Sequence, residues 1–572
     1  MGQGIRQRAD MAALGALAGV SLYLLAKIVD ENWLDERLAL ALVSFAVVFF
    51  AGGLSMAGPV RMARALGMAA ALGLAVALLL SWAGLRYDSL HDFQPFPLFA
   101  AAVLAVLPLP FLMAQAGPGW RDYPSLFTHS WGLFVRLSLA VIFVGVVWGV
   151  ILLSDALFGL IGLRWIEQAL EMPVAPWLIT GLVFGLALAV VNELSDYVSP
   201  FLILRLLRLL VVPVLVVLVV FGLALPVRGL GGLFGGLSSA ATLLAMVTAA
   251  VTLVSAAVDQ AEADAVGPGL QAWAVQALAL LVPVPAGLAA VSLWLRVGQY
   301  GWTPGRLFAA WMVVLALGYG VFYALAVLRP GWQVGVRRAN IGLALAVIGS
   351  AGLWLTPVLH PEAIAARSQL ARFEAGGRKP EDIDIYALSQ WGRAGDLALS
   401  RLEDIAAEPG QTALAARLAG EQQGNAPMDA AALRAALLAI LPLQPNDATA
   451  TRDAILAAAD PSLLNYWRAR CEQVLPEGQR GCVMVVADLW ADLPGPEALM
   501  VTTDEAGFLN YNGLVLTADG LQSHAVQDRD GFLPDQGEGR DLLMTLQVAP
   551  PVLEPAPFNQ ISVGAARLLM LP

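Results

Sequence analysis

Long apolar runs constrain the fold of this chain more than any other feature of its sequence. Crossing the roughly 30 Å hydrocarbon layer of a bilayer takes about 20 apolar residues in a helix, because only a helix or a closed barrel satisfies its own backbone hydrogen bonds there. Eleven such runs, joined by short connectors, cover residues 11–29, 38–58, 65–83, 98–115, 133–153, 176–192, 209–226, 238–257, 270–292, 305–328 and 340–358. The sequence therefore predicts a polytopic α-helical membrane protein with about eleven transmembrane helices.

The overall composition agrees with this assignment and excludes several classes of protein. Only 13% of the 572 residues are charged and 58% are hydrophobic, whereas about 25% charged residues is usual in soluble domains. This excludes a soluble enzyme and a disordered chain. The formal net charge of −11 would repel phosphate backbones, so we expect the lipid bilayer and not a nucleic acid as a partner.

Charge and hydropathy both change near residue 360. Residues 1–359 carry 18 Lys and Arg against 16 Asp and Glu, a net charge of +2, whereas residues 360–572 carry 15 against 28, a net charge of −13. No run after His360 is long and apolar enough to cross a bilayer. We therefore predict a transmembrane domain over 1–359 and a C-terminal α+β domain, with a helical part over 360–480 and a β-rich part over 481–572.

The pattern of apolar residues predicts the elements of this C-terminal domain. Apolar residues recur at helical spacing over 362–475, which favours four or five short amphipathic helices. Short β-type runs separated by glycine turns favour a small antiparallel sheet. These runs cover residues 483–487, 498–502, 514–518, 541–548 and 567–571. Within the membrane part, Asp155 to Leu170 has amphipathic spacing and is predicted to lie on the membrane surface as a helix.

The distribution of Arg and Lys in the loops predicts the orientation of the helices. With the N-terminus inside, the inner segments hold eleven Arg residues and the outer segments hold seven Arg or Lys residues. Asp259, Glu262 and Asp264 in a nominally inner loop are exceptions to this trend. The first apolar run is expected to be an uncleaved anchor, since it is too long for a signal peptide and has no small-residue cleavage site. Eleven crossings then place the C-terminal domain outside the cytoplasm.

The two cysteines of the chain support that orientation. Cys471 and Cys482 lie eleven residues apart in the predicted outer domain. Disulfides persist in the periplasm but seldom in the cytosol, so we expect these residues to form a disulfide. Two unpaired small residues are the alternative. A Cys-x-x-Cys redox pair or a zinc site is not supported, because the spacing is wrong and no histidine is near.

A short motif near the end of the ninth run carries a family resemblance. Tyr300, Gly301, Trp302, Thr303 and Arg306 form a Tyr-Gly-Trp-Thr-x-x-Arg sequence. It resembles the signature of a bacterial multi-pass membrane family catalogued as domain of unknown function 4153. The multi-helix layout is similar to that family, and so is the Asp-Ile-x-x-Tyr sequence from Asp382 to Tyr386. The resemblance implies a bacterial inner-membrane protein. Together with the orientation predicted from the Arg and Lys distribution, it gives a cytoplasmic N-terminus and a periplasmic C-terminal domain. It implies no activity.

The physical chemistry of the motif favours a structural role. Thr303 is a good N-cap and Pro304 suits the first position of a helix, so the motif is predicted to begin the tenth transmembrane helix. Tyr300 and Trp302 have amphipathic rings that suit the level of the lipid headgroups. A ligand-binding role for Arg306 is the alternative.

Two of the predicted helices contain similar breaks. Pro108 and Pro110 lie in the fourth run and Pro283 and Pro285 lie in the ninth, and each proline removes a backbone donor. Ordinary kinks are one interpretation, and an inverted repeat of the kind found in transporters is the other. Three glycine pairs with four-residue spacing are predicted to allow close helix packing. They are Gly15/Gly19, Gly181/Gly185 and Gly231/Gly235.

No arrangement of side chains indicates catalysis or a bound cofactor. Asp488, Asp492 and Glu497 weakly resemble a calcium loop, but Trp490 and Leu493 stand where ligand and turn residues are needed. The predicted spans also lack the buried carboxylates that coupled transporters use. We therefore expect no metal, no cofactor and no enzymatic activity. The function favoured is envelope binding, scaffolding or sensing through the acidic outer domain, whose partner would be an envelope protein or the cell wall.

The alternative function is a transporter or a lipid-handling protein. It would use a cavity where the prolines break the fourth and ninth transmembrane helices. A membrane enzyme is a weaker third choice, because no catalytic set of residues is present.

Overall fold

The computed structural model describes most of the chain. The described residues are 2–31, 33–89, 93, 95–194, 201–233, 239–376, 379–380, 383–425, 430–475, 478–490, 495–503, 509–517, 520–528, 536–554, 560–563 and 566–570. Asp382, Asp492, Leu493 and Gly235, which carried interpretations above, lie outside these residues. The described residues form two compact units, Met1–Glu421 and Gln422–Pro572.

The first unit contains the membrane helices. Among the described residues, eleven segments are long and apolar enough to cross a membrane, which confirms the predicted number. They are formed by α1 (Gly2–Asp30), α2 (Glu36–Met56), α3 (Met62–Gly84), α4 (Pro95–Val106) with α5 (Leu109–Gln115), α6 (Tyr123–Leu160), α8 (Ala175–Glu193), α9 (Phe201–Leu209) with α10 (Val211–Leu233), α11 (Ser239–Val258), α12 (Leu270–Leu281) with α13 (Pro283–Tyr300), α14 (Pro304–Val327) and α15 (Trp332–Leu355). Large apolar side chains such as Val141 and Ile142 are exposed on these helices, as expected for surfaces that face lipid.

Two of the predicted glycine pairs pack against each other between α1 and α8. A Cβ atom on Gly15 would lie 2.0 Å from the carbonyl oxygen of Gly181, and one on Gly185 would lie 2.2 Å from that of Met11. Gly19 approaches Trp177 in the same way, so the two helices run antiparallel with their backbones in contact. The prediction of close packing is confirmed for these pairs, because only glycine leaves room for such an approach.

Both proline-rich breaks interrupt their helices. The fourth span divides into α4 and α5 on either side of Leu107 and Pro108, and the ninth divides into α12 and α13 at Val282. The second break is closely packed, because a Cβ on Gly320 of α14 would lie 3.0 Å from the Cα of Pro283. Among the described residues, the α12–α13 break is therefore filled by a neighbouring helix.

The amphipathic helix predicted from Asp155 to Leu170 is wrong in its extent. Residues 155–160 continue α6, and a separate short helix, α7 (Trp165–Leu170), follows a turn at Gly162. Gly162 adopts a φ of +79°, a left-handed conformation that ends a helix and that side chains with a Cβ rarely adopt. The amphipathic spacing of the sequence continues across this turn. The pattern therefore does not predict where α6 ends and α7 begins.

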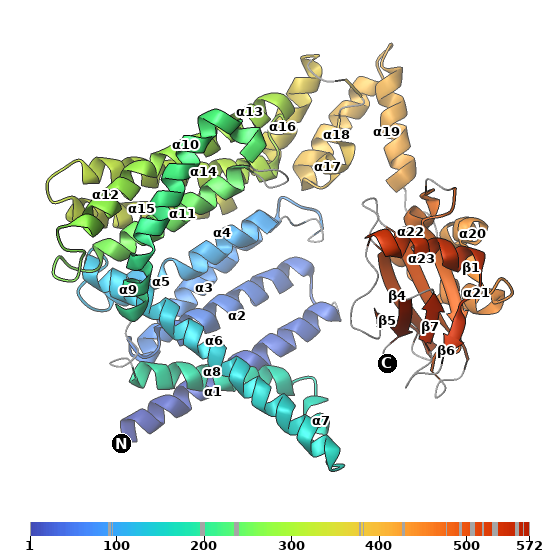
Figure 1. The fold of residues 1–572 in the computed structure, drawn as a ribbon, viewed down its shortest axis with the longest axis horizontal. Helices are drawn as coiled ribbons and strands as arrows, with labels where there is room; N and C mark the ends of the chain where they lie inside the picture. The colour runs from blue at the N-terminus through green and yellow to red at the C-terminus, as the bar shows by residue number, and fades with distance from the viewer. Residues whose placement is uncertain are drawn as a thin grey trace. The chain divides into compact units, whose positions relative to one another are not determined.

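Three helices that follow the last membrane helix belong to the same compact unit. They are α16 (Pro361–Glu374), α17 (Ile385–Ser389) and α18 (Gly392–Ala406), which we call the cap helices. Figure 1 shows them beside the ends of α13 and α14. Ile383, Leu388, Trp391 and Leu402 form a small core between them. The first unit therefore extends beyond residue 360 and includes the start of α19 (Thr412–Asn425).

The second unit is built around a sheet with helices on both faces. Its helices are α20 (Ala430–Ile440), α21 (Thr449–Ala458), α22 (Pro461–Glu472) and α23 (Gln536–Val548). Its described strands are β1 (Leu443–Gln444), β2 (Cys482–Ala487), β3 (Glu497–Thr503), β4 (Leu509–Thr517), β5 (Gly520–Asp528), β6 (Val552–Glu554), β7 (Gln560–Val563) and β8 (Ala566–Met570). The order is β1-β2-β3-β4-β5-β8-β7-β6, and every pair is antiparallel except β1 with β2.

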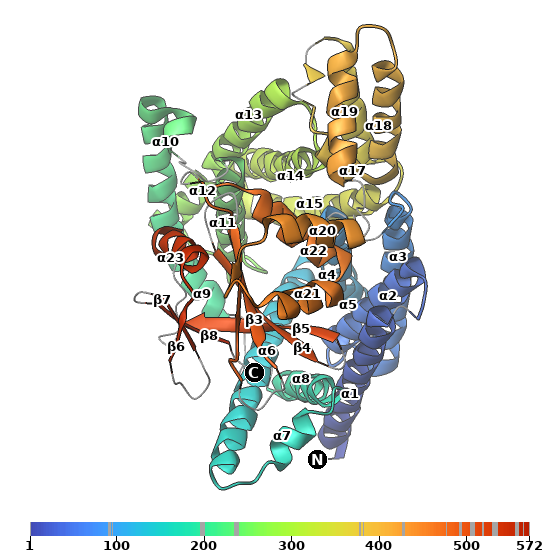
Figure 2. The same cartoon turned by 90° about the vertical axis from the view of Figure 1, so that its right-hand side faces the viewer.

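Alternating side chains of β2 supply two separate cores. Met484 and Val486 pack with α20 to α22, whereas Val483 and Val485 pack with α23 on the opposite face. Figure 2 shows α23 on a different side of the sheet from α20 to α22. This arrangement explains why the strand is apolar at every position, as a strand buried on both faces is.

Three predictions for the C-terminal part need correction. The run 541–548 is not a strand but part of α23, where Leu542, Leu543 and Leu546 form one buried helical face. The segment 362–475 contains seven described helices and not four or five, because short helices such as α17 fall below the length that periodicity can detect. The sheet is larger than expected and includes a parallel pair. The four other predicted strands fall within β2, β3, β4 and β8, except for residues 518 and 571, which lie outside the described ranges.

Candidate functional site

The family-like motif forms the turn between α13 and α14. Helix α13 ends at Tyr300, and Gly301 adopts a φ of +76°. The Thr303 hydroxyl accepts a hydrogen bond from the Arg306 backbone N–H at 3.3 Å, and Pro304 occupies the first position of α14. The predicted N-cap is therefore confirmed, and it satisfies a donor that the first turn of α14 leaves free.

Helix α16 binds the backbone of this turn directly. Gln369 Nε2 donates to the carbonyl oxygens of Tyr300 and Trp302 at 3.1 and 2.7 Å. Arg372 donates to the carbonyls of Gly298 and Gln299, both at 3.0 Å. These carbonyls include the free acceptors at the C-terminus of α13, so α16 caps that helix with side chains from outside it.

This close approach explains why the motif needs Gly301. A Cβ at this position would lie 2.9 Å both from Gln369 Nε2 and from Arg372 Cδ. The positive φ of Gly301 is a second restriction on any larger residue.

The turn also holds the side chain of Arg306 in place. Its guanidinium donates to the carbonyl oxygen of Gly301 at 2.7 Å and lies 5.4 Å from the centre of the Tyr300 ring. A guanidinium over an aromatic ring and in contact with a carbonyl is fixed in direction. Trp302 points elsewhere and packs against the membrane-helix core that contains Leu243 and Leu293.

The second motif segment lies opposite the turn. Ile383 is buried, and the Asp384 carboxylate caps α17 by accepting a hydrogen bond from the Ala387 N–H at 2.9 Å. Tyr386, the last residue of this segment, is exposed. The N-cap places the Asp384 carboxylate at the start of α17, and Asp384 lines the same cavity as residues of the α13–α14 turn.

The two motif segments line one cavity of about 250 Å³, which we call the motif cavity. Its polar wall contains Tyr300, Thr303, Arg306, Gln369 and Asp384. Its apolar wall comes from the cap helices and the segment before α17. These apolar residues are Leu370, Phe373, Ile383, Ala387, Leu388, Trp391, Ala398 and Leu402. The site therefore combines a positively charged group, a negatively charged group and an apolar floor.

A buried charge cluster fixes the cap helices to the membrane helices. Arg86, just after α3, donates to Glu362 of α16 at 3.3 Å and to the carbonyl oxygens of Trp354 and Thr356 at 2.7 and 2.9 Å. Tyr87 donates to the second carboxylate oxygen of Glu362 at 2.8 Å. Arg86 is 6% exposed and Glu362 is 1% exposed. We call Arg86, Tyr87, His360 and Glu362 the Arg86 cluster.

Charge pairing keeps Glu362 ionised despite its burial. Burial by itself raises the pKa of this carboxyl, but the contact with His360, the positive charge of Arg86 and the Tyr87 hydrogen bond lower it by more. The resulting pKa of Glu362 lies below its ordinary value. Since Gly392 at the start of α18 also approaches the Arg86 carbonyl, the end of α3 positions two of the three cap helices.

Sequence reasoning found some of these residues and missed others. Tyr300, Thr303 and Arg306 line the motif cavity, whereas Gly301 shapes the turn. Gln369 and Glu362 were missed because their role depends on contacts across more than 60 residues of sequence. Gln369 lies three residues after the buried Ala366, which places it near the inner face of α16. A polar residue at such a position was the one signal in the sequence for its role.

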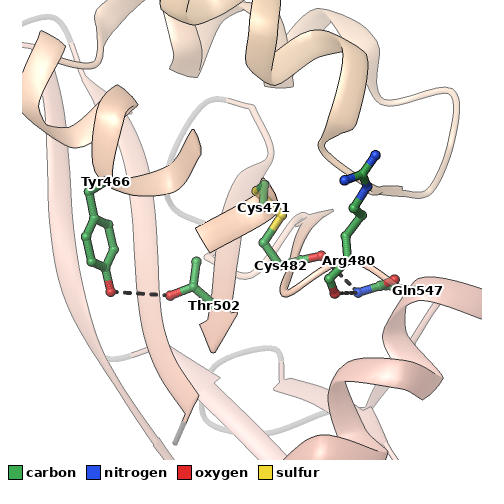
Figure 3. Close-up of a disulfide and its surroundings, with 6 residues drawn as sticks. All are labelled: Tyr466, Cys471, Arg480, Cys482, Thr502 and Gln547. Carbon is green, nitrogen blue, oxygen red and sulfur yellow. Dashed lines mark hydrogen bonds between the residues drawn. A yellow bond between two sulfur atoms is a disulfide. The ribbon is translucent and has the colours of Figure 1, made fainter. Parts of the chain in front are cut away.

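The two cysteines lie in the second unit and not among the residues that line the motif cavity. Cys471 and Cys482 form a disulfide, as predicted (Figure 3). The bridge connects the end of α22 to the start of β2. Gln547 of α23 donates to the backbone carbonyls of Arg480 and Cys482 at 2.6 and 3.0 Å, so elements from both faces of the sheet meet at this point.

Comparison with known proteins identifies the family. No curated protein and no solved structure matches the chain. The family model described as domain of unknown function (DUF4153) matches residues 16–402. This match begins within α1 and ends within α18, so it includes both motif segments and every residue that lines the motif cavity. The chain belongs to the DUF4153 family of multi-pass membrane proteins.

Proposed function

We propose that this protein is an envelope binding protein of a bacterial inner membrane, which holds a peptide segment of a partner protein in the motif cavity. The observation that carries the proposal is that both family motif segments line this one cavity, at the end of the membrane helices where the cap helices pack. In this proposal the N-terminus is cytoplasmic, and the cap helices and the second unit face the periplasm.

The size of the motif cavity favours part of a larger partner over a whole small molecule. A volume of about 250 Å³ is below the roughly 300–1,000 Å³ that is usual for drug-sized ligands. An apolar side chain of a peptide fits the floor made by Leu370, Leu388 and Leu402. Arg306 and Asp384 at the wall suit the carbonyl acceptors and N–H donors of the attached backbone.

The charge distribution supports the proposed orientation. The excess of Arg in the segments assigned to the cytoplasm follows the positive-inside rule. Eleven crossings starting inside bring the ends of α3, α13 and α15 to the outer side, which is where α16 to α18 would then pack. The paired cysteines of the second unit suit an oxidising compartment. The acidic second unit would make further contacts with an envelope protein or the cell wall.

The orientation is tested with two reporter fusions after Pro572. We expect an alkaline phosphatase fusion to be active, because this enzyme needs the periplasm to form its disulfides. A fluorescent protein that folds only in the cytosol is expected to stay dark. An inactive phosphatase together with a bright fluorescent fusion would overturn the orientation.

The binding site is tested by photo-crosslinking in living cells. A photoreactive side chain at Ala387, inside the motif cavity, should crosslink to one defined envelope protein, and the matched position Leu397, 73% exposed on α18, should not. Arg306→Gln, which removes the charge and keeps a donor for Gly301, should lower the yield at Ala387 several-fold. Equal yields from Ala387 and Leu397, or no effect of Arg306→Gln, would contradict binding in the motif cavity.

A further inference from the structure

A second cavity lies among the membrane helices, away from the motif cavity. It has a volume of about 400 Å³ and is lined by residues of α5, α6, α11, α14 and α15. Leu107 and Pro110 of the α4–α5 break form part of its wall. We call it the intramembrane cavity. Its volume is within the roughly 300–1,000 Å³ that small-molecule sites occupy.

A hydrogen-bond network fixes one side of the intramembrane cavity. Asn340 Nδ2 donates to the hydroxyl oxygen of Tyr123 at 3.0 Å and to that of Ser255 at 3.3 Å. Tyr323, fully buried, donates to Asn340 Oδ1, and its hydroxyl lies 2.8 Å from Ser255 Oγ. Tyr323 has a single hydroxyl hydrogen and donates it to Asn340, so in the contact with Ser255 the Ser255 hydroxyl is the donor. Side chains from three other helices, α6, α11 and α14, thus hold Asn340 of α15 in one orientation.

This network leaves two phenolic donors for a ligand. Tyr123 lines the cavity and accepts from Asn340, so its own hydroxyl hydrogen is free to donate. Tyr319 also lines the cavity, and its hydroxyl has no hydrogen-bond partner among the described residues. A group that offers two hydrogen-bond acceptors would satisfy both donors.

Two arginines at the end of α11, the helix that contributes Ser255 to the cavity, are already paired elsewhere. Arg208 forms an ion pair with Asp259 and donates to the Ala256 carbonyl at 3.1 Å. Arg337 donates to the carbonyls of Val258 and Asp259 at 2.7 and 3.1 Å. Both arginines cap the C-terminus of α11, and they balance the acidic loop that was an exception in the sequence. No Asp, Glu, Lys, Arg or His is among the described residues that line the cavity, so it suits an uncharged ligand.

The position of the cavity indicates how a ligand reaches it. Ser130 of α6 and Thr252 of α11 line the cavity and are exposed within membrane-spanning segments. The cavity is therefore not enclosed, and its open side near these two residues is the route by which a lipid-soluble ligand would enter. Phe127 and Trp131 add aromatic faces to its wall.

We infer that the intramembrane cavity binds an uncharged, lipid-soluble ring that bears carbonyl oxygens, the chemistry of an isoprenoid quinone. The ring packs on the aromatic wall, the two carbonyls accept from Tyr123 and Tyr319, and the apolar tail leaves through the open side near Ser130 and Thr252. The inference involves no electron transfer and does not depend on the proposed function of the motif cavity.

Binding is tested with the full-length protein in lipid nanodiscs and decylubiquinone as the probe. We expect saturable binding and a rise in melting temperature that increases with probe concentration. Decylbenzene has a similar tail and ring but no carbonyl oxygens, and it should produce no saturable shift. Tyr319→Phe should weaken decylubiquinone binding about 3- to 10-fold, the usual effect of losing one neutral hydrogen bond, and Tyr123→Phe/Tyr319→Phe should weaken it further.

Matched variants show whether the probe binds in this cavity or elsewhere on the protein. Tyr386→Phe removes an exposed hydroxyl outside the cavity and should leave the affinity unchanged. Arg306→Gln should also leave it unchanged, which distinguishes this site from the motif cavity. The unliganded melting temperature of each variant shows that it is folded. The inference is overturned if the wild-type protein does not bind decylubiquinone, if decylbenzene binds equally well, or if the folded double variant binds with wild-type affinity.

Discussion

Glu362 of α16 connects the cap helices to the end of α3. Its carboxylate pairs with Arg86 and Tyr87 in a region from which water is excluded. Glu362→Gln would leave the guanidinium of Arg86 buried without its counter-charge, and breaking a buried pair in this way typically costs about 3–5 kcal/mol. We expect a clearly lower melting temperature of the first unit. Glu374→Gln, which removes an exposed partner of Arg401, is the control and should change it little.

The same cluster predicts a dependence on pH. Because the folded pKa of Glu362 is below the ordinary value of 4.5, its contribution to stability is complete above about pH 4.5 and is lost as the pH falls through the lowered pKa. Arg86, Tyr87 and His360 are the polar groups that face this carboxyl. Proteolysis of the cap helices should therefore increase in acid for the wild-type protein. A wild-type acid dependence that Glu362→Gln retains in full would show that other groups cause it.

At the scale of elements, the contact between α1 and α8 depends on the absence of side chains. A Cβ on Gly181 would lie 2.1 Å from the carbonyl oxygen of Gly15, so the two helices must separate to accommodate one. We expect Gly181→Ala to destabilise the first unit by about 1–3 kcal/mol, as overpacking usually does. Gly145→Ala on α6 is the control, because no atom lies within 4 Å of the added Cβ and alanine favours a helix. If denaturant titrations gave Gly181→Ala and Gly145→Ala the same free energy of unfolding, the contact between α1 and α8 would not be important for stability.

At the scale of the whole molecule, the two compact units should respond separately to loss of the disulfide. The bridge between Cys471 and Cys482 lies in the second unit, and a short bridged loop contributes about 2–3 kcal/mol in the chain-entropy model. Cys471→Ala/Cys482→Ala should therefore lower the melting transition of the second unit only. Glu362→Gln should lower only the melting transition of the first unit. A single transition that both changes shift would mean that the units unfold together.

Local sequence was sufficient for the features that depend on hydrophobicity and nearby residues. The eleven spans were predictable because crossing hydrocarbon requires about 20 apolar residues whatever the tertiary contacts are. Thr303 as an N-cap, the glycine pairs on α1 and α8, and the strands β2 and β3 were predictable for a similar reason. Each is encoded within a few residues of sequence.

Only the tertiary structure decided where the candidate sites lie. The motif cavity needs α16 against the α13–α14 turn, and the intramembrane cavity needs Tyr123, Ser255 and Asn340 from three helices to meet. The strand predicted at 541–548 failed for a related reason, since an apolar run this short is compatible with a strand or a helix until the sheet provides a face for α23. Hydrophobicity sets which segments are buried in lipid or in a core, but contacts between distant segments decide which polar groups face one another.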